Sequence, residues 1–259
     1  MPFVDANKTV LYHQFDGSPQ DPVLLLSNSL GSDVSMWDAQ AEAFSRRYRV
    51  LRYDSRGHGR SAVPKGPYRI EDLGRDVLGL LDALGIERVR FCGLSKGGVV
   101  GMWLAANAPE RVERLVLCNT SAYFGNPPLW NARIEAVRTS GMQAVVPQVL
   151  ERWLSPEFRA RDPDAVERVR SMLLATPPEG YAACCEALRD MDLREAIGAI
   201  RAPTLVVVGT QDPATPPEMG RSIAERIRGA RVVELPTAHL SNVEAGERFT
   251  AAVLDFLEG

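Results

Sequence analysis

The chain has 259 residues, of which 45% are hydrophobic and 24% are charged. This length and balance are typical of a globular protein with one large core, so one α/β domain with an insertion is the first expectation. Because the net charge is only -3 and no basic run occurs, we expect neither a nucleic-acid partner nor an anionic membrane surface.

The N-terminal segment, the apolar runs, the cysteines and the histidines argue against further classes of protein. Residues 1–20 show no signal-peptide pattern, and no apolar run is long enough to cross a bilayer, so we expect a cytoplasmic protein. The spacing of the four cysteines suits neither a disulfide framework nor a metal site. They are Cys92, Cys118, Cys184 and Cys185. Since the three histidines are dispersed as well, we expect no metal and no cofactor.

Short β-rich runs alternate with helical stretches along most of the chain. Residues 9–15 are predicted as an edge strand, and further strands are predicted at residues 23–26, 50–53, 89–92, 115–118, 205–208 and 232–235. Apolar residues at helical spacing predict helices over residues 70–84, 95–107 and 249–257. Strands that are apolar on both faces belong in a parallel sheet covered by helices, so the pattern predicts an α/β fold.

From about residue 123 to residue 192 this alternation fails. Helical segments punctuated by proline follow one another there, at residues 129–139, 142–154, 163–174 and 179–189. The segment leaves the sheet after one strand and returns before the next, so we expect a helical cap over the carboxyl ends of the strands, where open α/β sheets bind ligands. The predicted division is a core of residues 1–122 and 193–259 with a cap of residues 123–192.

Residues 93–97 predict a nucleophile elbow around Ser95. They follow an apolar strand and precede a helix, and glycines stand two residues to either side of the serine, at Gly93 and Gly97. A β-carbon at those positions would clash in the tight turn that lifts the serine hydroxyl above the sheet. The pattern therefore identifies Ser95 as a candidate nucleophile.

A serine hydroxyl is a weak nucleophile and needs a histidine base held by a carboxylate. Asp212 follows the predicted strand at residues 205–208, and His239 follows the predicted strand at residues 232–235. The chain order Ser, Asp, His and the position after the strands both suit a triad. The other histidines precede the elbow: His13 lies in the predicted edge strand, and His58 lies in a glycine-rich turn.

Acyl transfer also requires donors for the developing oxyanion. On this architecture they are the backbone N–H of the residue after the nucleophile and one from the loop after an earlier strand. The sequence places Lys96 and Leu30 at those two positions. Only their backbone N–H groups are assigned here.

Taken together, these motifs resemble the 3-oxoadipate enol-lactonases of the α/β-hydrolase superfamily over nearly the whole chain. The resemblance rests on the Asn-Ser-Leu-Gly loop, the elbow, further core segments and the cap: residues 28–31, 53–61, 93–98, 105–111, 115–120, 130–142, 152–153 and 209–217. It implies the α/β-hydrolase fold, a mostly parallel sheet flanked by helices with an inserted helical cap. One departure is Lys96, which stands where methionine or glutamine is more familiar.

The resemblance implies hydrolysis of 3-oxoadipate enol-lactone in bacterial aromatic-compound catabolism, the β-ketoadipate pathway, without a cofactor. The substrate is a small anionic lactone, and its free carboxylate calls for a cation in the pocket. Arg133 in the cap is the first candidate, with Arg138 and the Lys96 side chain as alternatives. Trp130 and Trp153 are candidates for an apolar wall.

Other functions remain open at this point, because the fold alone does not set the substrate. A carboxylesterase or a hydrolase that cleaves carbon–carbon bonds in ring-fission products would use the same three residues. A ligand receptor on the hydrolase fold would bind with little turnover. The sequence leaves the oligomeric state and the catechol or protocatechuate branch of the pathway open.

Overall fold

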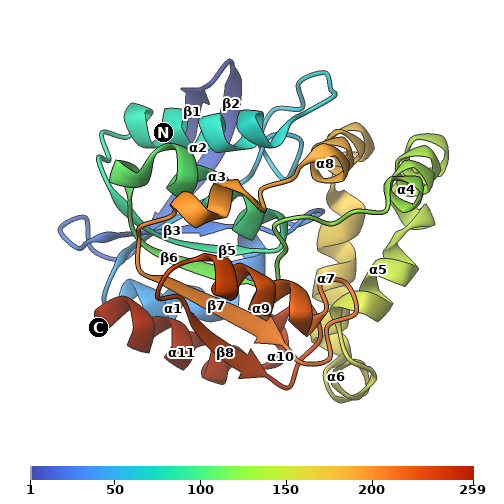
Figure 1. The fold of residues 1–259 in the computed structure, drawn as a ribbon. Coiled ribbons are helices and arrows are strands. Elements are labelled where there is room, and N and C mark those ends of the chain that lie inside the picture. Colours follow the sequence, from blue (N-terminus) through green and yellow to red (C-terminus); the bar gives the residue numbers. More distant parts are fainter. Residues whose placement is uncertain (1) are drawn as a thin grey trace.

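The computed structural model describes residues 2–259, and an eight-stranded sheet forms its centre (Figure 1). The strand order is β1-β2-β4-β3-β5-β6-β7-β8. Their bounds are Phe3–Ala6 (β1), Thr9–Asp16 (β2), Val23–Ser27 (β3), Arg49–Tyr53 (β4), Val89–Leu94 (β5), Val112–Cys118 (β6), Thr204–Gly209 (β7) and Arg231–Leu235 (β8). Strand β2 pairs antiparallel with β1 and with β4, and the other neighbouring strands within residues 2–259 pair parallel. The predicted mostly parallel sheet is therefore confirmed.

Helices cover both faces of the sheet. On one face, α2 and α3 pack together and α9 packs on β7, whereas α1 and α11 pack together on the other face (Figure 1). Their bounds are Asp38–Ser45 (α1), Ile70–Ala83 (α2), Lys96–Asn107 (α3), Pro217–Arg226 (α9), Ser241–Glu244 (α10) and Gly246–Glu258 (α11), with short 3-10 helices at Val34–Trp37 (η1), Pro109–Arg111 (η2) and Ala196–Ala199 (η4). Because the central strands are covered on both sides, their residues are almost all buried, as the apolar runs predicted.

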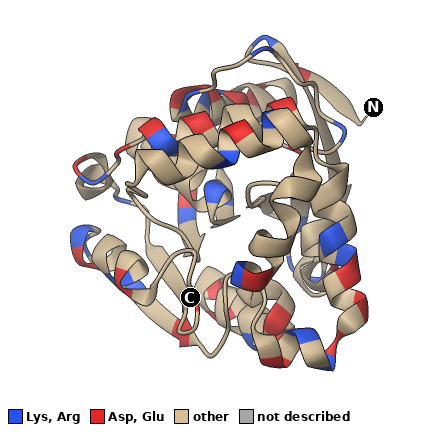
Figure 2. Ribbon diagram, turned by 90° about the vertical axis from the view of Figure 1, so that its right-hand side faces the viewer, with Lys and Arg blue, Asp and Glu red and all other residues tan. Residues whose placement is uncertain are grey.

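Five further helices follow β6 and precede β7, and we call them the cap helices. They are α4 (Pro127–Ser140), α5 (Val146–Trp153), α6 (Pro156–Arg161), α7 (Pro163–Ala175) and α8 (Pro178–Asp190), with the 3-10 helix η3 at Met142–Ala144. They stand together beside one end of the sheet (Figure 1). Acidic and basic residues are interspersed on this side of the molecule, so neither sign dominates it (Figure 2).

Some elements differ from the sequence prediction. The edge-strand prediction for residues 9–15 is wrong, because β1 pairs outside β2. Pro147, which has no N–H to donate, stands in the first turn of α5, and the predicted helix over residues 142–154 is split there into η3 and α5. The sequence patterns also missed α1, α6 and α9, which are short or rich in polar residues. No helix within residues 2–259 is long and apolar enough to cross a membrane.

Candidate active site

Ser95 lies in the sharp turn between β5 and α3. Its φ of 56° is in the region that a non-glycine residue seldom adopts. A β-carbon on Gly93 would lie 2.3 Å from the carbonyl oxygen of Gly97, and one on Gly97 would lie 2.1 Å from that of Ser27. The glycines are thus required by backbone contact, and the second contact brings the end of β3 against the elbow.

Asp212 lies in the loop after β7, where its carboxylate accepts several hydrogen bonds. Oδ1 accepts the N–H groups of Ala214 and Thr215 at 2.8 and 3.0 Å, and Oδ2 accepts the Thr215 hydroxyl at 2.6 Å. Burial raises the pKa of Asp212, but His239 and these hydrogen bonds lower it by more, so the pKa lies below its usual value. The carboxylate is therefore charged and held in one orientation.

His239 follows β8 and faces this carboxylate. Its Nδ1 lies 2.8 Å from Oδ2 of Asp212, and the ring is 2% exposed. A proton on Nδ1 satisfies this contact and leaves Nε2 as the basic nitrogen. The Trp153 ring lies 5.9 Å from the imidazole, and Leu240 N–H donates to the Trp153 carbonyl at 3.0 Å, so the cap is tied to the His239 loop.

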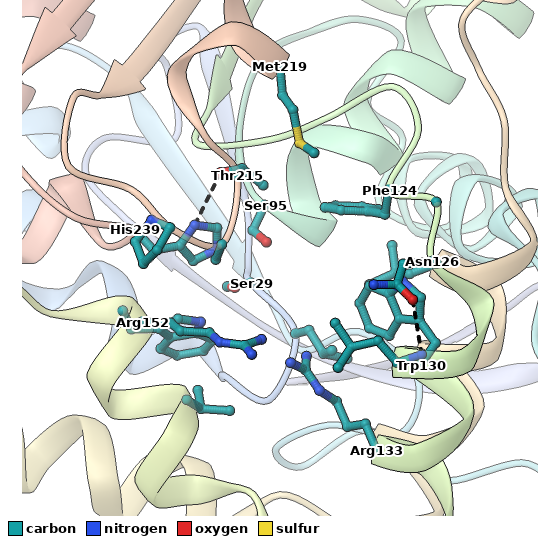
Figure 3. A pocket seen from close by; sticks show the side chains of 18 of the residues that line it. Ser29, Ser95, Phe124, Asn126, Trp130, Arg133, Arg152, Thr215, Met219 and His239 are labelled. Carbon is teal, nitrogen blue, oxygen red and sulfur yellow. Dashed lines mark hydrogen bonds between the residues drawn. The ribbon is translucent and has the colours of Figure 1, made fainter.

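Ser95 and His239 line the same cavity (Figure 3). Within residues 2–259 no hydrogen bond joins the Ser95 hydroxyl to the imidazole. Such a contact is often long or poorly aligned before a substrate is bound and tightens in the reacting complex. The arrangement can therefore support a serine nucleophile with a histidine base and an aspartate that orients the base.

Two residues that support Asp212 were not predicted. Asn119, just after β6, donates from Nδ2 to Oδ2 of Asp212 at 3.1 Å and to the Ala238 carbonyl at 3.2 Å. Thr215 stands three residues after Asp212, a spacing at which an aspartate side chain commonly accepts from the backbone. That spacing was a usable signal for Thr215, whereas Asn119 is brought to the site only by the strand order.

The predicted oxyanion donors lie in the loop after β3 and at the first residue of α3. Leu30 follows β3, lines the cavity, and its N–H donates to no group within residues 2–259. Lys96 is the first residue of α3, so its N–H has no acceptor within the helix. Both backbone groups are thus available as donors.

The Lys96 side chain lies elsewhere. It is completely buried, it does not line the cavity, and its Nζ has no hydrogen-bond partner among the described residues. Burial lowers the pKa of this amine below its usual value. The alternative that Lys96 reaches solvent or binds the substrate carboxylate is therefore not supported by the geometry.

The cavity has a volume of about 280 Å³, at the small end of ligand pockets. Besides Ser95 and His239 it is lined mainly by cap residues, among them Phe124, Trp130, Arg133, Arg152, Trp153 and Tyr181. The guanidinium groups of Arg133 and Arg152 point into it from α4 and α5 (Figure 3). No carboxylate of the described chain pairs with either arginine within 4.0 Å.

Three of the four predicted cap residues line this cavity, namely Trp130, Arg133 and Trp153. Arg138 does not line the cavity. It pairs instead with Glu179 at 3.3 Å and with Glu186 at 3.1 Å. Arg138 follows Arg133 by five residues on α4, so it points in another direction around the helix, and its charge is already paired. Arg152 was missed as a cavity cation, although its position beside Trp153 was a signal.

No group of three or more histidine, cysteine, aspartate or glutamate side chains within residues 2–259 could hold a metal ion. The four cysteines are buried as free thiols.

Comparisons with known proteins identify the family to which the chain belongs. The family model described as alpha/beta hydrolase fold matches residues 22–245. The chain is 41% identical to "3-oxoadipate enol-lactonase 2" and 36% identical to "3-oxoadipate enol-lactonase 1", both of Acinetobacter baylyi. These matches cover 96% and 95% of this chain and 93% and 92% of those proteins.

Among solved structures, the enol-lactonase from Burkholderia xenovorans LB400 is 47% identical with a TM-score of 0.98, and the match covers 100% of both chains. The chain belongs to the α/β-hydrolase family, and the resemblance to 3-oxoadipate enol-lactonases that its motifs predict is confirmed.

Proposed function

We propose that the chain hydrolyses the enol-lactone of 3-oxoadipate through an acyl-enzyme on Ser95, a step in the breakdown of aromatic compounds. The observation that carries this assignment is a small cavity in which Ser95 and His239 meet two cap arginines, Arg133 and Arg152, that no carboxylate within residues 2–259 pairs. The relatives named as 3-oxoadipate enol-lactonases support the same substrate.

In the acylation step, His239 takes the Ser95 proton as Oγ attacks the lactone carbonyl carbon. The negative charge that develops on the carbonyl oxygen is stabilised by the N–H groups of Leu30 and Lys96. The ring C–O bond then breaks, and the enol oxygen receives the proton from His239. An enolate is a far better leaving group than an alkoxide, so the ring opens with little acid assistance.

In the deacylation step, His239 removes a proton from water, which attacks the acyl carbon; the C–O bond to Ser95 then breaks, His239 returns the proton to the Ser95 oxygen, and the free acid is released. The enol then tautomerises to the ketone. Asp212 keeps its charge throughout, because its role is to hold the imidazole and stabilise the imidazolium. The depressed pKa of Asp212 suits this role.

The free carboxylate of the substrate gives the cap its function. A guanidinium can bind both oxygens of a carboxylate, so an arginine in the cavity would select an acidic lactone over a neutral ester. Arg133 lies over the Trp130 ring, with its guanidinium carbon 5.1 Å from the ring centre, which orients the charge. We assign Arg133 to the carboxylate, with Arg152 as the second cation.

A substrate panel tests the assignment. The wild-type protein is assayed with the enol-lactone, with a neutral p-nitrophenyl ester and with a ring-fission diketone. We expect the highest kcat/KM with the lactone. Faster turnover of the ester or of the diketone would transfer the assignment to a carboxylesterase or a carbon–carbon bond hydrolase, and binding without turnover would indicate a receptor.

A further inference from the structure

His58 is a buried histidine outside the cavity, in the turn after β4. Its Nε2 lies 2.8 Å from the backbone nitrogen of Gly31, and its Nδ1 lies 3.2 Å from the carbonyl oxygen of Arg56. A backbone N–H can only donate and a carbonyl can only accept. The two contacts therefore place the ring proton on Nδ1 and leave Nε2 as an acceptor for Gly31.

Gly31 directly follows Leu30, and both its backbone N–H and its carbonyl are hydrogen-bonded. His58 accepts its N–H, and the cap residue Thr176 donates its hydroxyl to the Gly31 carbonyl at 3.0 Å. The φ of Gly31 is +79°, and a β-carbon there would lie 2.9 Å from Leu173 Cδ2. The loop is thus fixed by one contact from the core and one from the cap.

The surroundings of the ring favour the uncharged form. Burial, followed by the charge of the neighbouring Lys96, lowers the pKa of His58 well below its usual value. The Cys184 thiol lies 4.0 Å from Nδ1. A second ring proton would point an N–H at the N–H of Gly31, so charging the ring would remove the contact that holds the loop.

We propose that His58 is a positioning residue of the oxyanion hole, whose Nε2 lone pair fixes Gly31 so that the adjacent Leu30 N–H meets the reacting carbonyl oxygen. This inference rests on the proposed role of Leu30. The charge on that oxygen exists mainly in the transition state, so loss of the acceptor should lower kcat more than it changes KM. A small misplacement of a catalytic group costs up to about 100-fold.

Three variants separate this role from a structural one. The side-chain oxygen in His58→Gln can reach the position of Nε2, whereas that in the shorter His58→Asn stops near Nδ1, and His58→Leu has no acceptor. Each is assayed with a p-nitrophenyl ester and with a boronic acid, whose tetrahedral adduct on Ser95 mimics the oxyanion. Thermal unfolding shows whether each variant folds.

For His58→Asn and His58→Leu we expect kcat to fall by roughly 10- to 100-fold with KM within about threefold of wild type. The boronic acid inhibition constant should rise by a similar factor, and His58→Gln should recover most of both losses. Equal losses in His58→Gln and His58→Asn, or a kcat close to wild type in His58→Asn, would overturn the inference. If His58→Leu fails to fold, the two amide variants still decide.

The ester and boronic acid assays do not depend on the lactone. A wild-type protein that cleaves the ester but not the enol-lactone would overturn the substrate assignment and leave the comparison of His58 variants valid. His58 variants that match wild type would overturn the positioning role and leave the lactone assignment intact.

Discussion

The Thr215 hydroxyl donates to Oδ2 of Asp212 at 2.6 Å, on the same oxygen that faces Nδ1 of His239 at 2.8 Å. This oxygen therefore has a partner besides the imidazole, and Asn119 donates to it as a third. Donors other than His239 thus hold the carboxylate, so its effect on the histidine can be tested separately from its packing.

Asp212→Asn should lower kcat by about 10⁴-fold, because an amide at this position favours the wrong imidazole tautomer. Thr215→Val leaves the Asp212–His239 contact in place and should cost far less. Ester hydrolysis with matched thermal unfolding measures both. Similar losses in the two variants would mean that the hydrogen-bond network, and not the aspartate charge, supports His239.

Arg133→Ala should raise KM for the acidic lactone by roughly 10- to 100-fold while sparing a neutral ester, because hydrogen bonds to a charged group contribute about 1.5–3 kcal/mol. Arg138→Ala is the matched control, since Arg138 comes from the same helix but lies outside the cavity, paired with Glu179 and Glu186. Steady-state kinetics on both substrates measure the difference. An equal effect of Arg133→Ala on lactone and ester would remove Arg133 from carboxylate recognition.

Lys96→Met should stabilise the fold by roughly 1–3 kcal/mol, because it removes a buried amine that has no hydrogen-bond partner among the described residues. Lys65→Met, at an exposed position, is the control and should change the free energy of unfolding little. Equilibrium denaturation measures both.

The advantage of Lys96→Met should shrink at alkaline pH. The pKa of Lys96 is lowered in the folded protein from an unfolded value of 10.5, so between these two values the unfolded state binds more protons. Wild-type stability relative to the variant therefore rises as pH rises towards 10.5. A stability difference that is constant from neutral to alkaline pH would show that the Lys96 amine does not titrate with a depressed pKa.

The cap meets the core at a contact between two glycines. A β-carbon on Gly180 of α8 would lie 2.1 Å from the carbonyl oxygen of Gly57, in the turn that carries His58. Gly180→Ala should therefore destabilise the protein by roughly 1–3 kcal/mol, or several degrees in Tm. Gly198→Ala is the control, because a β-carbon there meets nothing within 4 Å. A Tm for Gly180→Ala equal to that of the control would mean that the cap shifts without cost.

The apolar strands and the residues at their carboxyl ends could be predicted because local patterns encode them. Val23 to Leu26 form a continuous apolar run, and Gly93 is required by its contact with Gly97 in the same turn. The sequence therefore indicated the sheet and the residues that could form a triad.

The remaining features depend on contacts between distant segments. Asn119 reaches Asp212 only because β6 and β7 are neighbours, and His58 reaches Gly31 only because β3 and β4 are. The direction of the Lys96 side chain, into the core and not the cavity, follows from packing under the cap. Spacing along the chain carries no signal for such contacts.

The most direct test follows the ultraviolet absorbance of the enol-lactone with the wild-type protein and with Ser95→Ala. We expect rapid loss of absorbance with the wild type, no loss above the uncatalysed rate with Ser95→Ala, and unchanged folding of the variant. Lactone turnover that survives Ser95→Ala, or a wild-type protein that leaves the lactone intact, would contradict the account.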